Sequence, residues 1–449
     1  MLIEFSVGNF WSFKEIQTLQ MQAAKIKSKF AKVDVENTFA ISNKLSLLKS
    51  KAIYGANASG KSNLIRAFRA MYYIIKDNLS NPEVLNQNIL PFKFDEGTTK
   101  QPSFFQLIFI LEDVQYRYGF EASATTITSE WLFGKPLNAV GVRERYYFVR
   151  EGDQVDVNEE WFKEGASFAK TSDKMQPLFR NNSLFLTVVA AFNGPISLEI
   201  IRLIVNRVSI DPGYDTTMLE GLSMQLISEN STFEQFITEL LISIDPTIRK
   251  IELVDMEHAI PDFPDKDKFL QNLKKQGQAV NDVAVYRSVY AHSGKIIGQT
   301  SVMLDFQEAE GTKKMFALSS IIFLVLTKGG ALFIDELDAR LHPRLTRKII
   351  QMFNSRSTNP NNAQLIFVTH DSTLLDAHLI RRDQIVFAKK DKFGATQLFS
   401  LAEFKGVRND ASFEKDYLLG KYGAVPNNLN AMEGVFENSV AYSKKDEKD

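Results

Sequence analysis

The sequence predicts an α/β fold in which a mixed sheet is flanked by helices, with a β-hairpin subdomain and a compact, mostly helical insertion. Three observations predict it. A glycine-rich segment lies between a short apolar run and an amphipathic helical pattern, over residues 52–75. Two further apolar runs, residues 331–334 and 365–368, each end in polar residues. Because buried parallel strands are continuously apolar and bind ligands at their carboxyl ends, these segments predict one sheet with one polar edge.

The composition limits the possible functions. The chain has 449 residues, 44% of them hydrophobic, so it can build a packed core in two or three domains, or in one large domain with an insertion. The net charge of -1 gives no strong field toward nucleic acid or membrane. The absence of cysteine excludes a thiol nucleophile, a cysteine zinc site and a disulfide framework.

Two segments bear on membrane insertion and export. The opening MLIEFSVGNFWSF predicts a strand and a turn, because it lacks the basic start and long apolar stretch of a secretory signal. The most apolar region, residues 315–334, is interrupted by polar residues and glycines, and its uninterrupted apolar part falls far short of the roughly 20 residues of a membrane span. We therefore expect a cytoplasmic protein with no membrane partner.

Residues 55–62, GANASGKS, have the spacing of a phosphate-binding P-loop in its usual setting between a strand and a helix. Gly55 and Gly60 let the backbone curl so that its N–H groups face the phosphates, and the helix N-terminus adds partial positive charge. Lys61 would reach the terminal phosphates of ATP, and the Ser62 hydroxyl would bind Mg²⁺. The residues expected to bind nucleotide here are Gly55, Asn57, Ser59, Gly60, Lys61, Ser62 and Asn63.

The segment GGALFIDELDARLHP supplies the complementary half of such a site. Residues 331–334 predict a buried strand that ends in Asp335 and Glu336. Asp335 would hold Mg²⁺ as a second metal residue beside Ser62, and Glu336 would act as the base for attack on the γ-phosphate. Alone, such a motif could be an acidic turn after a strand; paired with a P-loop, it predicts a nucleotide site.

A third segment, QLIFVTHDSTLLD, predicts another buried strand at residues 365–368. It ends in Thr369, His370 and Asp371. A single histidine at a strand end is often structural, but its place after the acidic strand favours a sensor of the γ-phosphate. The expected catalytic residues are therefore Glu336, His370 and Lys61.

In this order, and with a long gap between the first two, these elements resemble those of the ABC-type ATPases of the SMC, Rad50 and RecF group. More closely, they resemble the RecF-like AAA15 subfamily, which includes ATPase subunits of bacterial abortive-infection and anti-phage systems. The resemblance rests on IEFSVGNFWSFKE, FIDELDARLHP and EKDYLLGKYGAVPN, and covers roughly residues 1–150 and 300–430. It implies an ABC-type ATPase head that uses ATP and Mg²⁺.

The resemblance also implies contacts between two copies. In ABC dimers a signature helix meets ATP bound to the opposite subunit, and Gly311 and Thr312 occupy the place of its N-terminus. Asp338 stands where the family's D-loop crosses the dimer interface. The chain departs from the family pattern at Ala309, where a hydroxyl residue is usual, and at Trp11, where a basic residue is frequent. We expect a weak, not an absent, signature contact.

The middle of the chain distinguishes it from SMC and Rad50 proteins, which carry long coiled coils there. No sustained heptad repeat occurs. PSFFQLIFIL and VQYRYGFEAS predict a hairpin across residues 112–113, and SLEIIRLIVNRV and STFEQFITELLISI predict helices. The expected division is a first ATPase half at 1–150, a mainly helical insertion at 151–295, a second ATPase half at 296–430, and a polar tail at 431–449.

Two family features stay unassigned. The Q-loop glutamine could be Gln87 or Gln106, since neither has a deciding pattern around it. A nuclease centre in the same chain is not expected, because the five histidines are scattered and no second acidic cluster follows residue 390.

The favoured hypothesis is an ATPase that forms a homodimer, possibly a higher oligomer, through ATP-sandwiched heads and acts as the sensor of an anti-phage system. It would control a separately encoded toxin or nuclease, with a phage-derived trigger possible. The alternative is a RecF-like, ATP-gated clamp in DNA repair, which would need a basic groove and strongly salt-dependent binding. Whether DNA is a partner stays open.

Overall fold

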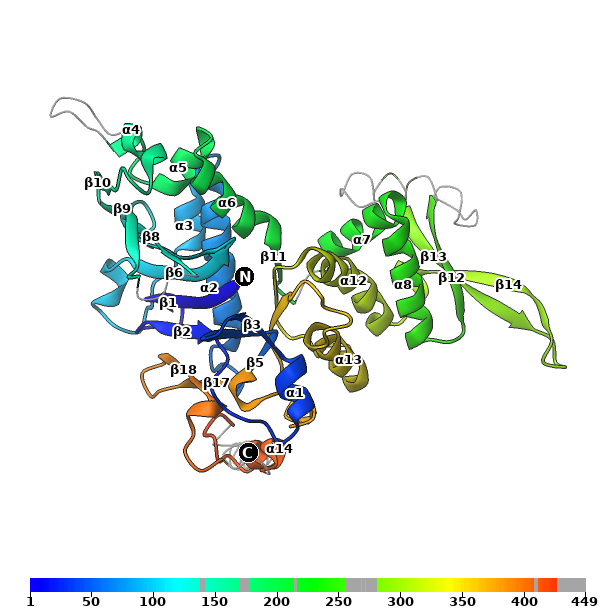
Figure 1. Cartoon of the computed structure of the whole chain (residues 1–449). Helices are drawn as coiled ribbons and strands as arrows, with labels where there is room; N and C mark the ends of the chain where they lie inside the picture. Colours follow the sequence, from blue (N-terminus) through cyan, green and yellow to red (C-terminus); the bar gives the residue numbers. More distant parts are fainter. Residues whose placement is uncertain are drawn as a thin grey trace, which may run out of the picture.

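The computed structural model describes residues 1–137, 142–169, 178–213, 216–255, 268, 271, 281–407 and 411–425. Two groups of elements meet at a mixed sheet (Figure 1). The first group contains the N-terminal strands and helix α2, and the second contains helices α7, α8 and α12 with a small sheet. The predicted polar tail at 431–449 lies outside the described residues.

The mixed sheet confirms the predicted α/β fold of a P-loop ATPase. Its strand order is β11-β15-β16-β5-β17-β18, and all neighbours are parallel except β17 and β18. The three strands predicted from apolar runs, β5, β15 and β16, lie side by side and are buried along their whole length. The strands are β5 (Ser50–Tyr54), β11 (Val208–Asp211), β15 (Ala331–Ile334), β16 (Gln364–Val368), β17 (Ile385–Lys390) and β18 (Thr396–Ser400).

Three long helices cover this sheet. The helix after the P-loop, α2 (Lys61–Asp77), packs on it through Phe68, whose ring stacks on Phe333 of β15 at 3.8 Å between centroids. On another side, α12 (Glu310–Lys328) and α13 (Pro343–Asn354) bury apolar residues in a second core together with β15 and β16. The apolar faces of the three helices therefore hold the polar strand ends in place.

A seven-stranded antiparallel sheet forms most of the N-terminal half, in the order β10-β9-β8-β7-β6-β1-β2. It contains the predicted hairpin, since β6 and β7 pair along their full length. Glu112 and Asp113 form the turn. The strands are β1 (Leu2–Gly8), β2 (Gln17–Gln20), β6 (Ser103–Leu111), β7 (Val114–Ala122), β8 (Ile127–Pro136), β9 (Arg145–Glu151) and β10 (Gln154–Val157).

The insertion contains the two predicted helices, but also β structure that the sequence analysis did not predict. The helices are α6 (Pro195–Arg207) and α8 (Ser231–Ile244), with α7 (Thr217–Glu229) between them. The unpredicted sheet has the order β12-β13-β14, formed by β12 (Ile248–Asp255), β13 (Asn281–Tyr290) and β14 (Ile296–Met303). The short β11, also within 151–295, joins the edge of the mixed sheet.

The remaining α-helices and strands of the described residues are short. They are α1 (Ala31–Glu36), β3 (Thr38–Ser42), β4 (Leu45–Leu48), α3 (Val84–Asn88), α4 (Ala166–Ala169), α5 (Phe185–Ala191), α11 (Leu304–Gln307) and α14 (Phe413–Leu418). In the part of the chain that the structure describes, no single helix is long and apolar enough to cross a bilayer. Helices α5 and α6 pass that test only as a pair, and their axes are bent by 108°.

A buried ion pair ties the antiparallel sheet to α5. Arg150 and Glu130 are both fully buried, with 3.6 Å between the guanidinium nitrogen and the carboxylate oxygen. The Glu130 carboxylate also accepts the backbone N–H groups of Phe185 and Leu186 at the start of α5, and Arg150 donates to the carbonyl of Ser183. Each of these buried charges is therefore compensated by the other, and removal of one leaves the other buried without its partner.

We predict that Arg150→Met destabilises this half of the protein by about 3–5 kcal/mol, because it leaves the Glu130 carboxylate buried without its cation. Urea unfolding followed by tryptophan fluorescence measures this, since Trp131 lies in the same sheet. The matched control is Arg202→Met, which removes an exposed arginine from its pair with Glu199 and should cost at most about 1 kcal/mol. Equal effects of the two substitutions would contradict the structural role.

Candidate functional site: a P-loop cavity

The P-loop joins β5 to α2, as its sequence setting predicts. Gly60 is left-handed, with φ of 99°, and a Cβ there would collide with the side chains of Thr396 and Ser12. Only glycine therefore fits at this bend. Lys61 is 5% exposed, and its ammonium group donates to the carbonyls of Gly55 at 2.8 Å and Ala56 at 2.9 Å. The loop thus curls around its own lysine.

The two residues predicted to bind metal are in contact. The Ser62 hydroxyl donates to the Asp335 carboxylate at 3.0 Å. Burial raises the pKa of Asp335 above its ordinary value; the hydrogen bond from Ser62 lowers it, and the neighbouring Glu336 raises it again. A buried carboxylate with an adjacent hydroxyl and a second carboxylate is an all-oxygen donor set, which is the type that Mg²⁺ prefers.

Glu336, Asp338 and His370 lie around the same opening. Glu336 has a positive φ of 49°, which is uncommon for a residue with a side chain and turns the chain sharply after β15. The backbone N–H of His370 donates to both Asp338 oxygens, at 3.2 and 3.3 Å. Burial lowers the pKa of His370, and so does the charge of Lys61, so its imidazole is neutral at pH 7.

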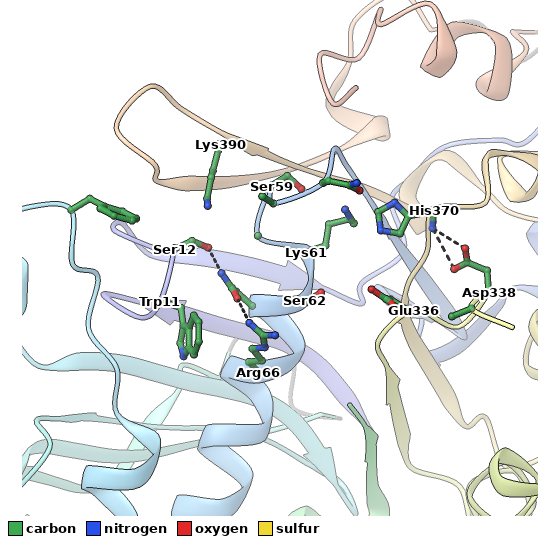
Figure 2. Close-up of a pocket in the computed structure, with 16 residues that line it drawn as sticks. Trp11, Ser12, Ser59, Lys61, Ser62, Arg66, Glu336, Asp338, His370 and Lys390 are labelled. Carbon is green, nitrogen blue, oxygen red and sulfur yellow. Dashed lines mark hydrogen bonds between the residues drawn. The ribbon is translucent and has the colours of Figure 1, made fainter. Parts of the chain in front are cut away.

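These residues line one cavity of about 830 Å³. Figure 2 shows Glu336, Asp338 and His370 on one side of Lys61, and Trp11 and Lys390 on the other. The predicted nucleotide residues Asn57, Ser59, Gly60, Lys61, Ser62 and Asn63 all line it. A cavity of this size lies within the range of small-ligand sites, about 300–1,000 Å³.

The residues present fit a phosphate group. The Ser59 hydroxyl is buried and has no hydrogen-bond partner, although it lies in the P-loop itself. Buried hydroxyls are normally paired, so an unpaired one within the P-loop is suited to donate to an anionic oxygen. Asn63 is held by Ser12, to whose hydroxyl it donates at 2.7 Å, and it accepts from Arg66 at 3.2 Å. Arg66 in turn lies over the ring of Trp11 at 4.9 Å.

Four predicted residues do not line this cavity, namely Gly55, Asp335, Gly311 and Thr312. Gly311 and Thr312 lie in the first turn of α12, which begins at Glu310 after Ala309. Neither of them lines the cavity of its own chain. A contact with nucleotide on the opposite subunit, as the family resemblance implies, stays a prediction.

The structure separates the two Q-loop alternatives. Gln106 lies in the antiparallel sheet, where its side-chain oxygen accepts the indole N–H of Trp131 at 3.2 Å. Gln87 lines a second cavity, of about 470 Å³, together with Asp335 and Arg66. Of the two, only Gln87 shares a cavity with Asp335, one of the two residues predicted to bind metal.

The sequence analysis missed Lys314. It is 5% exposed on α12, and its ammonium group donates to the backbone carbonyl of Glu336 at 2.9 Å. Burial lowers the pKa of Lys314, whereas the nearby charge of Asp211 raises it. Asp211 ends β11, is fully buried, and keeps one carboxylate oxygen without a hydrogen-bond partner. A signal was available, because Lys314 is four residues before the buried Leu318 and so lies on the same helix face.

The sequence of the chain matches the model of a known protein family. A family model described as "AAA domain, putative AbiEii toxin, Type IV TA system" matches residues 52–376, from the P-loop strand to beyond His370. The chain belongs to this family. The matched range includes most of β5 and all of β11, β15 and β16, and ends before β17 and β18.

The structural comparisons give more distant similarities. The SMC head domain from Thermotoga maritima is 13% identical, with a TM-score of 0.39, and the alignment covers 89% of this chain and 98% of that one. An SmcHead bound to the C-winged helix domain of ScpA is 12% identical, also with a TM-score of 0.39, over 89% and 97% of the two chains. No curated protein matches the sequence.

We predict that Asp335→Asn raises the melting temperature of the nucleotide-free protein at pH 8. The raised pKa of Asp335 means that its charged form is disfavoured in the folded state, so removing the charge relieves a cost. That cost is present above the folded pKa and disappears as pH falls to the ordinary pKa of aspartate. The gain over wild type should therefore shrink toward pH 4, which thermal melts across this pH range would measure. A gain that is constant with pH would contradict this electrostatic explanation.

Proposed function

We propose that the protein binds and hydrolyses ATP at the P-loop cavity, as an ABC-type ATPase. The observation that carries the proposal is the Ser62–Asp335 hydrogen bond beside the buried Lys61, with Glu336 and His370 at the same opening. Hydrolysis of a phosphoanhydride needs charge stabilisation and an oriented water, and little covalent chemistry from the protein. These five side chains supply both requirements.

Each residue then has a defined role. The P-loop N–H groups and Lys61 bind the β- and γ-phosphates, which neutralises their charge. Ser62 and Asp335 would hold Mg²⁺, which supplies further charge neutralisation when bound. Glu336 accepts the proton of the attacking water, and the neutral imidazole of His370 donates a hydrogen bond to the γ-phosphate.

Lys314 acts through Glu336 as a positioning residue. Its ammonium group holds the Glu336 carbonyl at the left-handed residue that follows Asp335, and Asp211 compensates its charge. A left-handed backbone at a glutamate is maintained only where its surroundings fix it. Because Lys314 lies three residues after Gly311, it also connects the start of α12 to the proposed base.

We further propose that two copies sandwich ATP, with Gly311, Thr312 and Asp338 of one chain facing the P-loop of the other. Glu310, next to Gly311, has an exposed side chain, which supports this arrangement, whereas the Thr312 side chain is buried, so a contact would use the backbone of the helix start. The N–H groups of this helix start are suited to an anionic γ-phosphate.

The biological role that we propose is that of an AAA15-type sensor in a bacterial anti-phage system of the abortive-infection type. In this role the cytoplasmic ATPase controls a separately encoded toxin or nuclease and responds to a phage-derived trigger. The family's description, which names a putative AbiEii toxin and a type IV toxin–antitoxin system, supports a place in such systems. Purification with the product of the neighbouring gene tests this role, and retention of duplex DNA without such a partner would favour a repair clamp.

We predict that Lys61→Ala abolishes ATP binding, whereas Glu336→Gln retains binding and lowers kcat by roughly 10²–10⁴-fold, the contribution typical of a general base. Phosphate release and binding of a fluorescent ATP analogue measure the two effects. The matched control is Glu112→Gln, because Glu112 also has a positive φ but lies in a distant hairpin turn. Wild-type turnover by the Glu336→Gln protein would show that Glu336 is not the base.

A second prediction concerns Lys314. Lys314→Met should lower kcat by roughly 10–100-fold through misplacement of Glu336, with ATP affinity little changed, since small misplacements of catalytic groups carry such costs. Lys314→Arg should recover part of the activity because it keeps the donor and the charge. The control is Lys313→Met, which removes the neighbouring lysine from its exposed pair with Glu310. A loss of ATP affinity equal to the loss in kcat would refute a positioning role.

A further inference from the structure

The segment EKDYLLGKYGAVPN, which begins at Glu414, lies beyond the range matched by the family model. The structure describes it as far as residue 425, and its first part lies in helix α14. The Tyr417 ring stacks on Phe387 of β17, with 5.7 Å between centroids, and meets the Tyr54 ring edge-on at the same distance. Since Tyr54 is the last residue of β5, α14 lies where the P-loop begins.

The Tyr417 hydroxyl contacts the first residue of the P-loop. Burial raises the pKa of Tyr417, and a hydrogen bond from the backbone N–H of Gly55 lowers it. The Gly55 carbonyl in turn accepts the Lys61 ammonium group at 2.8 Å. A single residue, Gly55, therefore connects the Tyr417 hydroxyl with the lysine that is proposed to bind the phosphates.

One turn earlier on α14, Glu414 contacts the segment that carries His370. Its carboxylate accepts the Ser372 hydroxyl at 3.1 Å. The residue between His370 and Ser372 is held as well, because the Asp371 carbonyl accepts the Tyr54 hydroxyl at 3.3 Å. The contact of Glu414 with Ser372 therefore restrains the backbone that follows His370.

Helix α14 is fixed on the sheet by its buried aromatic residues. A helix of six residues is not stable in isolation, so its packing determines its position. Phe413 and Tyr417 are four residues apart and are buried on the same face. Gly420, with a φ of 75°, ends the helix, and its N–H donates to the Tyr417 carbonyl at 2.8 Å. Both contacts of α14 with the site therefore start from one fixed support.

We propose that α14 positions the two halves of the ATPase site, through Tyr417 at the start of the P-loop and Glu414 at the segment after His370. The proposal rests on the proposed ATPase function and assigns it two positioning residues. Tyr417 acts through Gly55 on Lys61, which binds the phosphates before any bond breaks, so loss of the Tyr417 hydroxyl weakens ATP affinity. Glu414 acts on His370, which contacts the γ-phosphate during hydrolysis, so loss of the Glu414 contact lowers kcat.

Tyr417→Phe tests the first contact, because it removes the hydroxyl and keeps the ring. In the full-length protein we expect the Kd for ATP to rise roughly 3–10-fold, as for the loss of one hydrogen bond, with kcat changed less than about twofold. Competition of ATP with a fluorescent ATP analogue measures Kd, and phosphate release measures kcat. The matched control is Tyr422→Phe, which removes a hydroxyl from a second ring stacked on Phe387 and should leave Kd unchanged. An unchanged Kd in Tyr417→Phe overturns the proposal.

Glu414→Ala tests the second contact. It should lower kcat roughly tenfold through displacement of His370, with the Kd for ATP changed less than about twofold. Glu414→Gln keeps an oxygen that can accept from Ser372, so it should recover most of the activity. The control is Lys415→Ala, which shortens an exposed side chain on the same helix. Equal losses of kcat in Glu414→Ala and Glu414→Gln would contradict a role for this hydrogen bond.

The wild-type protein separates this proposal from the one on which it rests. Wild type that neither binds nor hydrolyses ATP would refute the ATPase function itself. Turnover by wild type, with an unchanged Kd in Tyr417→Phe and an unchanged kcat in Glu414→Ala, would refute only the role of α14. Circular dichroism and thermal melts check that each variant is folded.

Discussion

The hydrogen bond between the Ser62 hydroxyl and the Asp335 carboxylate joins positions 273 residues apart in the chain. It can form only if β5 and β15 end at the same edge of the sheet, and the chain meets this requirement by placing β16 between them. The stacking of Phe68 on Phe333 packs α2 against β15. The order of these strands and the packing of α2 therefore keep the Ser62 hydroxyl and the Asp335 carboxylate in contact.

That arrangement is electrostatically costly. Four charged side chains at this site are at most 8% exposed, namely Lys61, Lys314, Asp211 and Asp335. Burial lowers the pKa of the two lysines and raises the pKa of the two aspartates, so it favours the neutral form of each. Their mutual attraction offsets part of the cost, as does the large apolar core beneath the sheet. A site held in this way has charges placed before a ligand arrives, so binding needs little rearrangement of the protein.

Three of the six strands of the mixed sheet, β5, β15 and β16, and most of the cavity could be predicted because their signals are local. Buried parallel strands such as β15 are uninterrupted apolar runs, and the P-loop has fixed spacing next to a strand and a helix. The sheet β12-β13-β14 escaped prediction because β14 is exposed on both faces, and so shows no alternation of apolar and polar residues. Lys314 and Asp211 escaped because a buried charge is recognisable only with its partner, which lies on a distant segment. The place of β11 at the sheet edge is likewise set by long-range pairing with β15.

The position of β11 makes the insertion part of the sheet that carries the acidic residues. The Asp211 carbonyl accepts the N–H of Asp335 at 3.0 Å, and a Cβ at Gly213 would lie 2.6 Å from the Asp335 carbonyl oxygen. The chain then continues into α7, where Ser223 donates to the carbonyl of Phe316 in α12. A rotation of the insertion can therefore be transmitted to Asp335 and Glu336 in two ways. One is along the backbone near Gly213, and the other is through α12. A force that displaces the insertion would therefore change the positions of Asp335 and Glu336.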